Sequence, residues 1–169
     1  LCDASFDADR TEVLERAWKA GVSAIIAVSE TLADAQRNLE LAQDHALLRP
    51  AAGLYPTHLD LADAEAMIAF IRRERSKLWA IGEVGLDHWK VKEEAERDVQ
   101  REIFGKFIDL SLELDLPLNV HSRSAGRCAI ALLLERNARR VQLHAFDGKA
   151  ATALPAVEAG CFFSIPPSV

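Results

Sequence analysis

Six short runs of apolar and β-branched residues recur along the chain, and segments of helical periodicity separate them. The runs cover residues 21–29, 49–56, 78–87, 116–122, 141–146 and 160–167. Each run is short enough to be a strand. Between the runs, apolar residues recur every three or four positions, as at Ile103, Phe107 and Leu110, which predicts amphipathic helices. Strands that alternate with helices imply parallel pairing with right-handed crossovers.

The spacing of these runs favours one α/β architecture. Dividing 169 residues among six runs gives a repeating unit of roughly 28 residues. A TIM-type (β/α)8 barrel with such units needs about 250 residues, so this chain holds about six of the eight units. A doubly wound sheet is the alternative, but the sequence has neither a GxGxxG turn nor a P-loop to favour it. We therefore expect residues 1–169 to form a single, partial barrel domain.

Composition narrows the class of protein. The chain is 50% hydrophobic and 27% charged, which is typical of a globular domain with one sizeable core. No apolar stretch approaches the roughly 18 residues of a membrane span, and the start lacks the features of a signal peptide. Cys2, Cys128 and Cys161 are far apart and form no CxxC pair, which disfavours a disulfide framework or a thiolate zinc site. We expect a cytoplasmic protein with no membrane association.

One acidic residue interrupts an otherwise apolar run. In LWAIGEVGLD, residues 78–87, Leu78 to Ile81 show no polar alternation, as in a strand covered on both faces, yet Glu83 follows. A buried carboxylate must be protonated, paired or bound to a metal ion. The plainer alternative is an edge strand, or the end of a strand, that turns Glu83 into solvent.

Further polar residues stand at or just after the ends of the predicted strands, where barrel enzymes build their sites. They are Glu83, Asp87, His121, Arg123, His144 and Asp147, and His58 follows the second run. A single histidine is more often structural, but two at equivalent strand ends beside a carboxylate favour a hydrolytic site for zinc, manganese, iron or magnesium. His45 is expected to be structural. His88 is either a loop residue or a substrate contact.

Four motifs in register give a more specific indication. IGEVGLD, NVHSRSAG, LHAFDG and FFSIPPS occur in this order, and from about Phe6 to Val169 the chain resembles the TatD-like family of metal-dependent deoxyribonucleases, which are amidohydrolase-type barrels. The resemblance implies that Glu83 bridges two divalent metal ions (Mg, Mn or Zn). It also implies that His121 and His144 each ligate a metal. Arg123 and His58 match positions near which the family holds substrate phosphate.

The chain also departs from the family pattern. Family members open with a strand that ends in a His-x-His pair and close with a strand that carries a ligand aspartate, and neither motif is present here. Tyr55 stands where the family often has a histidine. We therefore expect a barrel that lacks about its first and last strands, with exposed edges at 21–29 and 160–167. We also expect this chain, as a fragment of a longer reading frame, to be inactive alone.

The resemblance predicts a hydrolase that cleaves phosphodiester bonds, with single-stranded DNA as substrate. No obligate protein partner is evident from the sequence. Glu83, His121 and His144 are the expected catalytic and metal-binding residues, while Arg123 and His58 are expected to bind substrate. The net charge of -6 disfavours a broad electrostatic grip on nucleic acid, so phosphate recognition would be local. Two other functions stay open: an amidohydrolase-type amide or lactone hydrolase, and a catalytically silent fragment or binding module.

Overall fold

The computed structural model describes residues 1–166, which form a six-stranded parallel sheet in the order β1-β2-β3-β4-β5-β6. The strands are β1 (Ile25–Ala27), β2 (Leu48–Ala52), β3 (Ala80–Gly85), β4 (Leu118–His121), β5 (Val141–Leu143) and β6 (Phe162–Phe163). Each lies within its predicted run, except that β2 begins one residue early. The sixth predicted run ends at Pro167, which lies outside the described residues.

The described residues also form six α-helices and two short 3-10 helices, which precede the first strand or connect the strands. They are η1 (Ala4–Phe6), α1 (Arg10–Lys19), α2 (Leu32–Asp44), α3 (Leu61–Glu74), η2 (Arg75–Lys77), α4 (Glu94–Leu114), α5 (Gly126–Glu135) and α6 (Ala150–Glu158). Local sequence sets some of their starts: the Thr31 hydroxyl accepts from the Asp34 N–H in a capping box, and Asp60 caps α3. Within residues 1–166 no helix is long and apolar enough to cross a membrane.

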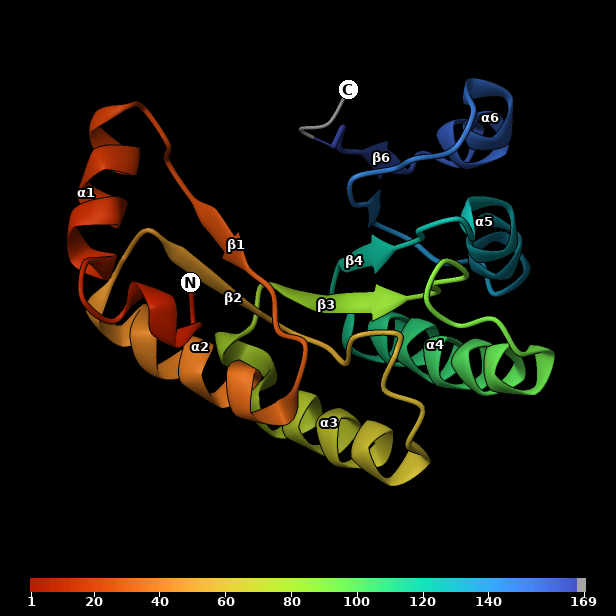
Figure 1. The fold of residues 1–169 in the computed structure, drawn as a ribbon, viewed down its shortest axis with the longest axis horizontal. Helices are drawn as coiled ribbons and strands as arrows, with labels where there is room; N and C mark the ends of the chain where they lie inside the picture. The colour runs from red at the N-terminus through yellow and green to blue at the C-terminus, as the bar shows by residue number, and fades with distance from the viewer. Residues whose placement is uncertain (167–169) are drawn as a thin grey trace.

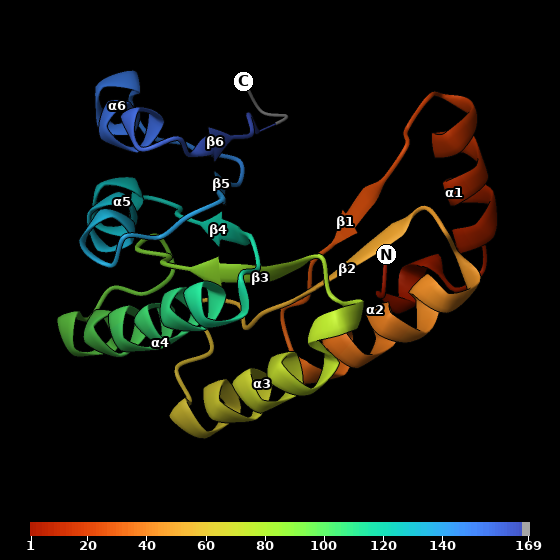
Figure 2. The ribbon, with the colours of Figure 1, turned by 180° about the vertical axis from the view of Figure 1, so that it is seen from behind.

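The sheet is curled: its strands form the inner layer of the structure, and the helices form an arc around the outside (Figure 1). The view from behind shows the same curl, with β1 and β6 as the two edges (Figure 2). This arrangement confirms the prediction of an incomplete TIM-type barrel with edges at its first and last observed strands. The core lies between the sheet and the helices, and its largest fully buried side chains include Phe104, Phe107 and Met67.

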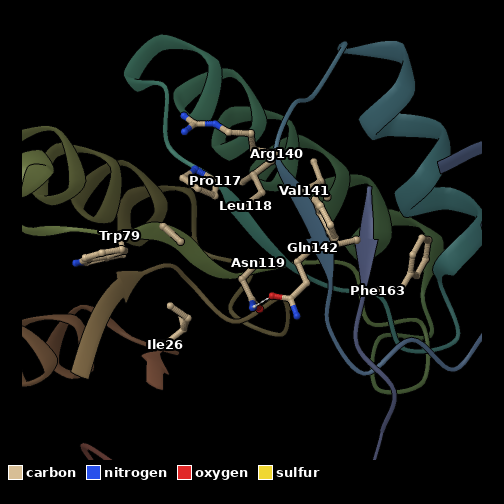
Figure 3. A pocket seen from close by; sticks show the side chains of 11 residues that line it. Ile26, Trp79, Pro117, Leu118, Asn119, Arg140, Val141, Gln142 and Phe163 are labelled. Carbon is tan, nitrogen blue, oxygen red and sulfur yellow. Dashed lines mark hydrogen bonds between the residues drawn. The ribbon is translucent and has the colours of Figure 1, made fainter. Parts of the chain in front are cut away.

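The inner side of the sheet is hollow at the N-terminal ends of the strands. A cavity of about 590 Å³ is lined mostly by apolar side chains, among them Ile26, Trp79, Val141 and Phe163 (Figure 3). Such a lining offers few groups that could act on a substrate. The polar residues that could do so lie at the opposite, C-terminal ends of the strands.

Candidate active site

A second cavity, of about 480 Å³, lies at the C-terminal ends of the strands. It is lined by Glu30, Tyr55, Glu83, His121, Ser122, Arg123, His144, Ala145, Asp147 and Pro166. Parallel strands end at a common edge of the sheet, so residues far apart in sequence meet there. The structure thus brings together five residues expected from sequence: Glu83, His121, Arg123, His144 and Asp147.

The position of Glu83 is set through its backbone. The Glu83 N–H donates to the Ser29 carbonyl at 3.0 Å, and the Ser29 N–H donates to the Gly82 carbonyl at 3.2 Å. The buried Ser29 hydroxyl also donates to the Gly53 carbonyl, at 3.0 Å, and accepts from the Gly53 N–H, at 2.9 Å. These bonds fix the middle of β3, and the side chain of Glu83 is only 11% exposed. Of the two alternatives for Glu83, the structure supports burial rather than a side chain turned into solvent.

A glycine allows β3 to approach β4 beside the site. Gly85 has a φ of +142°, and a Cβ built on it would lie 2.0 Å from the His121 carbonyl oxygen. The same oxygen accepts a hydrogen bond from the Leu86 N–H at 3.0 Å. Only a residue without a side chain fits there, which explains the second glycine of the IGEVGLD motif.

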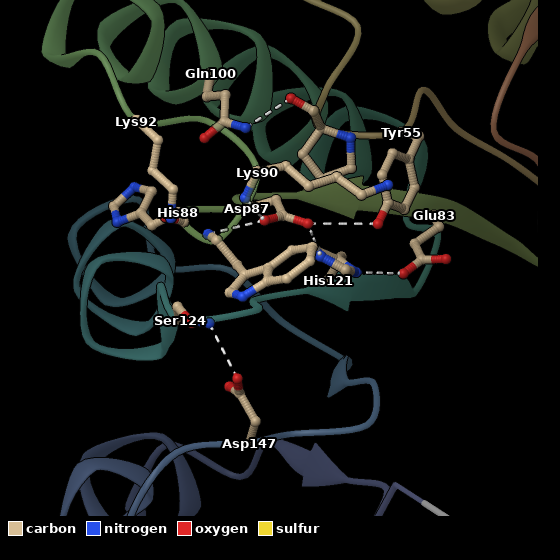
Figure 4. Close-up of polar contacts among 12 residues, drawn as sticks. Tyr55, Glu83, Asp87, His88, Lys90, Lys92, Gln100, His121, Ser124 and Asp147 are labelled. Atoms are coloured by element: carbon tan, nitrogen blue, oxygen red, sulfur yellow. Dashed lines mark hydrogen bonds and ion pairs between the residues drawn. The ribbon is translucent and has the colours of Figure 1, made fainter.

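The His121 imidazole lies between two carboxylates (Figure 4). Its Nδ1 is 2.8 Å from Glu83 Oε1, and its Nε2 is 3.0 Å from Asp87 Oδ2. Burial lowers the pKa of His121, but hydrogen bonds and charges from Glu83 and Asp87 outweigh it and leave that pKa raised. A neutral imidazole has one N–H, so satisfying both contacts requires a second proton or a cation in its place.

Asp87 holds the surrounding loop as well as the histidine. The carboxylate is fully buried, and its Oδ1 accepts from the N–H groups of Trp89, at 2.9 Å, and Lys90, at 2.7 Å. Burial raises the pKa of Asp87, but hydrogen bonds from the Lys90 N–H and from His121 leave it lowered overall. An ionised carboxylate on the far nitrogen of a histidine is the usual companion of a metal-binding imidazole.

The side chains around the cavity are of the types that bind a divalent cation, but the described residues do not come close enough together to form a complete set of ligands. His144 lines the same cavity, but its Nδ1 is 3.4 Å from the Ser164 hydroxyl, and both nitrogens of His121 face carboxylates. Within residues 1–166 no three His, Cys, Asp or Glu side chains lie close enough together to hold a metal ion. A carboxylate and two imidazoles around one polar cavity still match the ligands of hydrolytic metals. The ligand roles of Glu83, His121 and His144 stay predictions.

The two residues expected to bind substrate phosphate are separated. Arg123 lines the cavity, whereas His58 lines a neighbouring one with Thr31 and Asp63. The Tyr55 N–H donates to the Glu30 carbonyl and the His58 N–H donates to the Tyr55 carbonyl. This turn directs Tyr55 into the candidate active site and leaves His58 behind it, where Nδ1 is 3.2 Å from the Glu30 carbonyl. Of the pair, only Arg123 is placed to contact a substrate in this cavity.

Sequence reasoning missed Glu30 and Tyr55 as lining residues. Glu30 directly follows the first predicted strand, so the rule that singled out Glu83 and His121 could have found it. Tyr55 stands near the end of the second predicted run, where the family often has a histidine, so the same rule could have found it too. Its hydroxyl is 3.4 Å from Asp87 Oδ2, and its ring meets His121 edge-on, with ring centroids 5.0 Å apart.

The pKa of the Tyr55 hydroxyl is expected to be unusually high. Burial, then the negative charges of Asp87 and Glu83, raise its pKa to about 12 from the ordinary value of 10.0. The chain has one tyrosine, so phenolate absorbance reports this residue alone. In metal-free protein we expect phenolate to form near pH 12. The unfolded chain ionises first, so stability should fall between about pH 10 and 12. A folded-state midpoint near pH 10 would contradict this placement of Tyr55.

Comparisons with known proteins agree with the fold and with the motifs. The family model described as TatD related DNase matches residues 1–169. The chain belongs to the TatD-related DNase family. The human protein named deoxyribonuclease TATDN3 is 39% identical over 176 residues, covering 97% of this chain and 64% of the relative.

Other members of the TatD-related family are similar over comparable lengths. Bacillus subtilis YabD, named an uncharacterized metal-dependent hydrolase, is 30% identical over 94% of this chain and 63% of its own length. The 3'-5' ssDNA/RNA exonuclease TatD of Erwinia amylovora is 32% identical over 88% and 58%. The crystal structure of YJJV, a TatD homologue from Escherichia coli, superposes with a TM-score of 0.85 at 27% identity, over 95% of this chain and 63% of that one. The chain thus spans less than two thirds of each relative.

Proposed function

We propose that this protein is a metal-dependent hydrolase that cleaves phosphodiester bonds in single-stranded DNA. The observation that carries the proposal is the Glu83–His121–Asp87 arrangement at the C-terminal end of the sheet, in a chain of the TatD-related DNase family. The names of the human and Erwinia relatives, a deoxyribonuclease and a single-strand exonuclease, support the choice of bond and of substrate.

Each residue of the proposed site has a distinct task. Two divalent ions of the Mg, Mn or Zn type, when bound, would supply Lewis acidity and an activated water. Glu83 presents an anionic oxygen beside Nδ1 of His121, and Asp87 fixes the His121 ring through Nε2. His144 presents a second imidazole to the cavity. Arg123 lines the same cavity and would neutralise substrate phosphate with a charge-assisted contact.

The test compares two variants that should fail differently. In the full-length protein, His144→Ala should lower bound metal and turnover together, because it removes a metal ligand. Arg123→Ala should mainly raise KM for single-stranded DNA and keep bound metal, because it removes a phosphate contact. Metal content by mass spectrometry and nucleotide release from a labelled oligonucleotide measure both effects.

A substrate panel decides between bond types, because the same barrel also carries hydrolases of amides and lactones. Single-stranded DNA, a simple phosphodiester, an amide and a lactone are offered with Mg²⁺ or Mn²⁺. Phosphodiester cleavage alone is expected. Hydrolysis of the amide or the lactone without nuclease activity would contradict the proposal and favour the other bond type. Small and equal effects of the two substitutions on DNA cleavage would also contradict it.

A further inference from the structure

An exposed tryptophan stands beside the candidate active site. Trp89 is 52% exposed and lies in the loop between β3 and α4. The loop is firmly held, because Asp87 accepts from the N–H groups of Trp89 and Lys90 and the His88 N–H donates to the Arg123 carbonyl at 3.0 Å. The carboxylate that orients His121 therefore also fixes the position of Trp89.

Two aromatic rings beside the cavity each have a positively charged side chain over them. The Arg123 guanidinium carbon lies 4.0 Å from the centroid of the Trp89 ring, and Lys90 Nζ lies 5.0 Å from that of Tyr55. Arg123 and Tyr55 both line the cavity, so this group borders it directly. Arg49 and Trp79 form the same kind of pair elsewhere in the chain, so what distinguishes the Arg123–Trp89 pair is its place at the border of this cavity.

Packing does not explain an exposed indole at this place. An arginine over an exposed indole contributes little to stability, and half of the Trp89 surface stays in water. Single-stranded nucleic acid, in contrast, is bound by this pairing of groups: aromatic rings stack on bases while basic side chains contact the phosphates. Any base can stack, so such a contact suits an enzyme that cuts without regard to sequence.

We propose that Trp89, with Arg123 and Lys90 beside it, binds the nucleotide next to the scissile phosphate, with the indole stacked on its base. This inference rests on the proposed function and adds a specific binding residue to it. Trp89 touches the base and takes no part in bond cleavage, so its loss should appear in KM more than in kcat. The requirement is for a base, not for a particular one.

The experiment uses the full-length protein with Mn²⁺ and two matched oligonucleotides. One carries thymine at every position, and the other has abasic sugars at the positions flanking the cleaved bond. Trp89→Ala should raise KM for the thymine substrate roughly tenfold or more, as for the loss of one stacked base, and barely change KM for the abasic one. Trp89→Phe should retain most of the affinity, whereas Trp89→Leu, apolar but not aromatic, should not.

Trp79 offers a matched control. It is 57% exposed and lies under the Arg49 guanidinium, with the guanidinium carbon 4.9 Å from its ring centroid, but it precedes β3 at the opposite end of the sheet. Trp79→Ala should leave KM for both substrates unchanged. A protein in which Phe replaces Trp18, Trp79 and any tryptophan outside residues 1–169 keeps Trp89 as its one tryptophan, and oligonucleotide should quench its fluorescence.

Three results would overturn the inference. The first is a Trp89→Ala protein that cleaves both substrates like the unchanged protein, and the second is one whose KM rises equally for both. The third is Trp89 fluorescence that does not change when the oligonucleotide is added. In each case an unchanged protein that still cleaves single-stranded DNA leaves the proposed function standing. If the unchanged protein cleaves neither substrate, the proposed function fails and the base-stacking role fails with it.

Discussion

Replacing Glu83 with glutamine is expected to remove metal binding and phosphodiester hydrolysis while the fold persists. The Glu83 backbone is held by Ser29, and the substitution keeps the side-chain shape, so β3 should stay in place. A neutral amide oxygen attracts a divalent cation far less than a carboxylate does, and it cannot balance charge on His121. Metal affinity should fall by about 100-fold or more and kcat/KM by about 1000-fold or more.

The measurement is a metal-binding titration beside nucleotide release from single-stranded DNA, with thermal unfolding as the check on the fold. Glu65→Gln is the matched control, because it makes the same chemical change in an exposed ion pair with Lys106 and should alter neither quantity. Glu83→Gln that binds metal and cleaves DNA like the unchanged protein would remove Glu83 from the ligand set. Loss of activity with full metal occupancy would assign Glu83 another catalytic task.

The strands and the gathering of the site were predictable because they depend on short-range pattern and on topology. A strand of a parallel sheet is covered on both faces, so runs such as residues 78–87 stand out as apolar. Once the order of strands is parallel, their ends meet, which places Glu83, His121 and His144 around one cavity without knowledge of any contact.

The separation of His58 from the cavity was not predictable, because it depends on the path of a loop. Tyr55 and His58 follow β2 within six residues, and the run gives no indication of which side chain turns inward. The backbone bond from Tyr55 to Glu30 decides it, and Glu30 belongs to a different strand connection. The contact of two carboxylates with one imidazole was not predictable either, because topology brings Glu83, Asp87 and His121 to one end of the sheet but does not fix which of their atoms meet.

Gly85→Ala is expected to have the largest effect on folding of any substitution considered, because it meets two obstacles at one position. The φ of +142° is one that L-amino acids rarely adopt, and the new Cβ would lie 2.0 Å from the His121 carbonyl oxygen. Relief requires β3 and β4 to separate where they carry Glu83 and His121. The expected loss is several kcal/mol, a large part of the roughly 5–15 kcal/mol that stabilises a typical domain.

Gly21→Ala separates the two causes. Gly21 also has a positive φ, of +91°, but a Cβ there meets nothing within 4 Å. The free energy of unfolding of the Gly21→Ala protein should fall only by the cost of the positive φ, about 1–2 kcal/mol. Urea unfolding followed by circular dichroism measures both, and a Gly85→Ala protein too unstable to purify would agree with the prediction. Equal losses for the two variants would mean that β4 yields easily at His121, and that the close contact of β3 with β4 does not hold the site together.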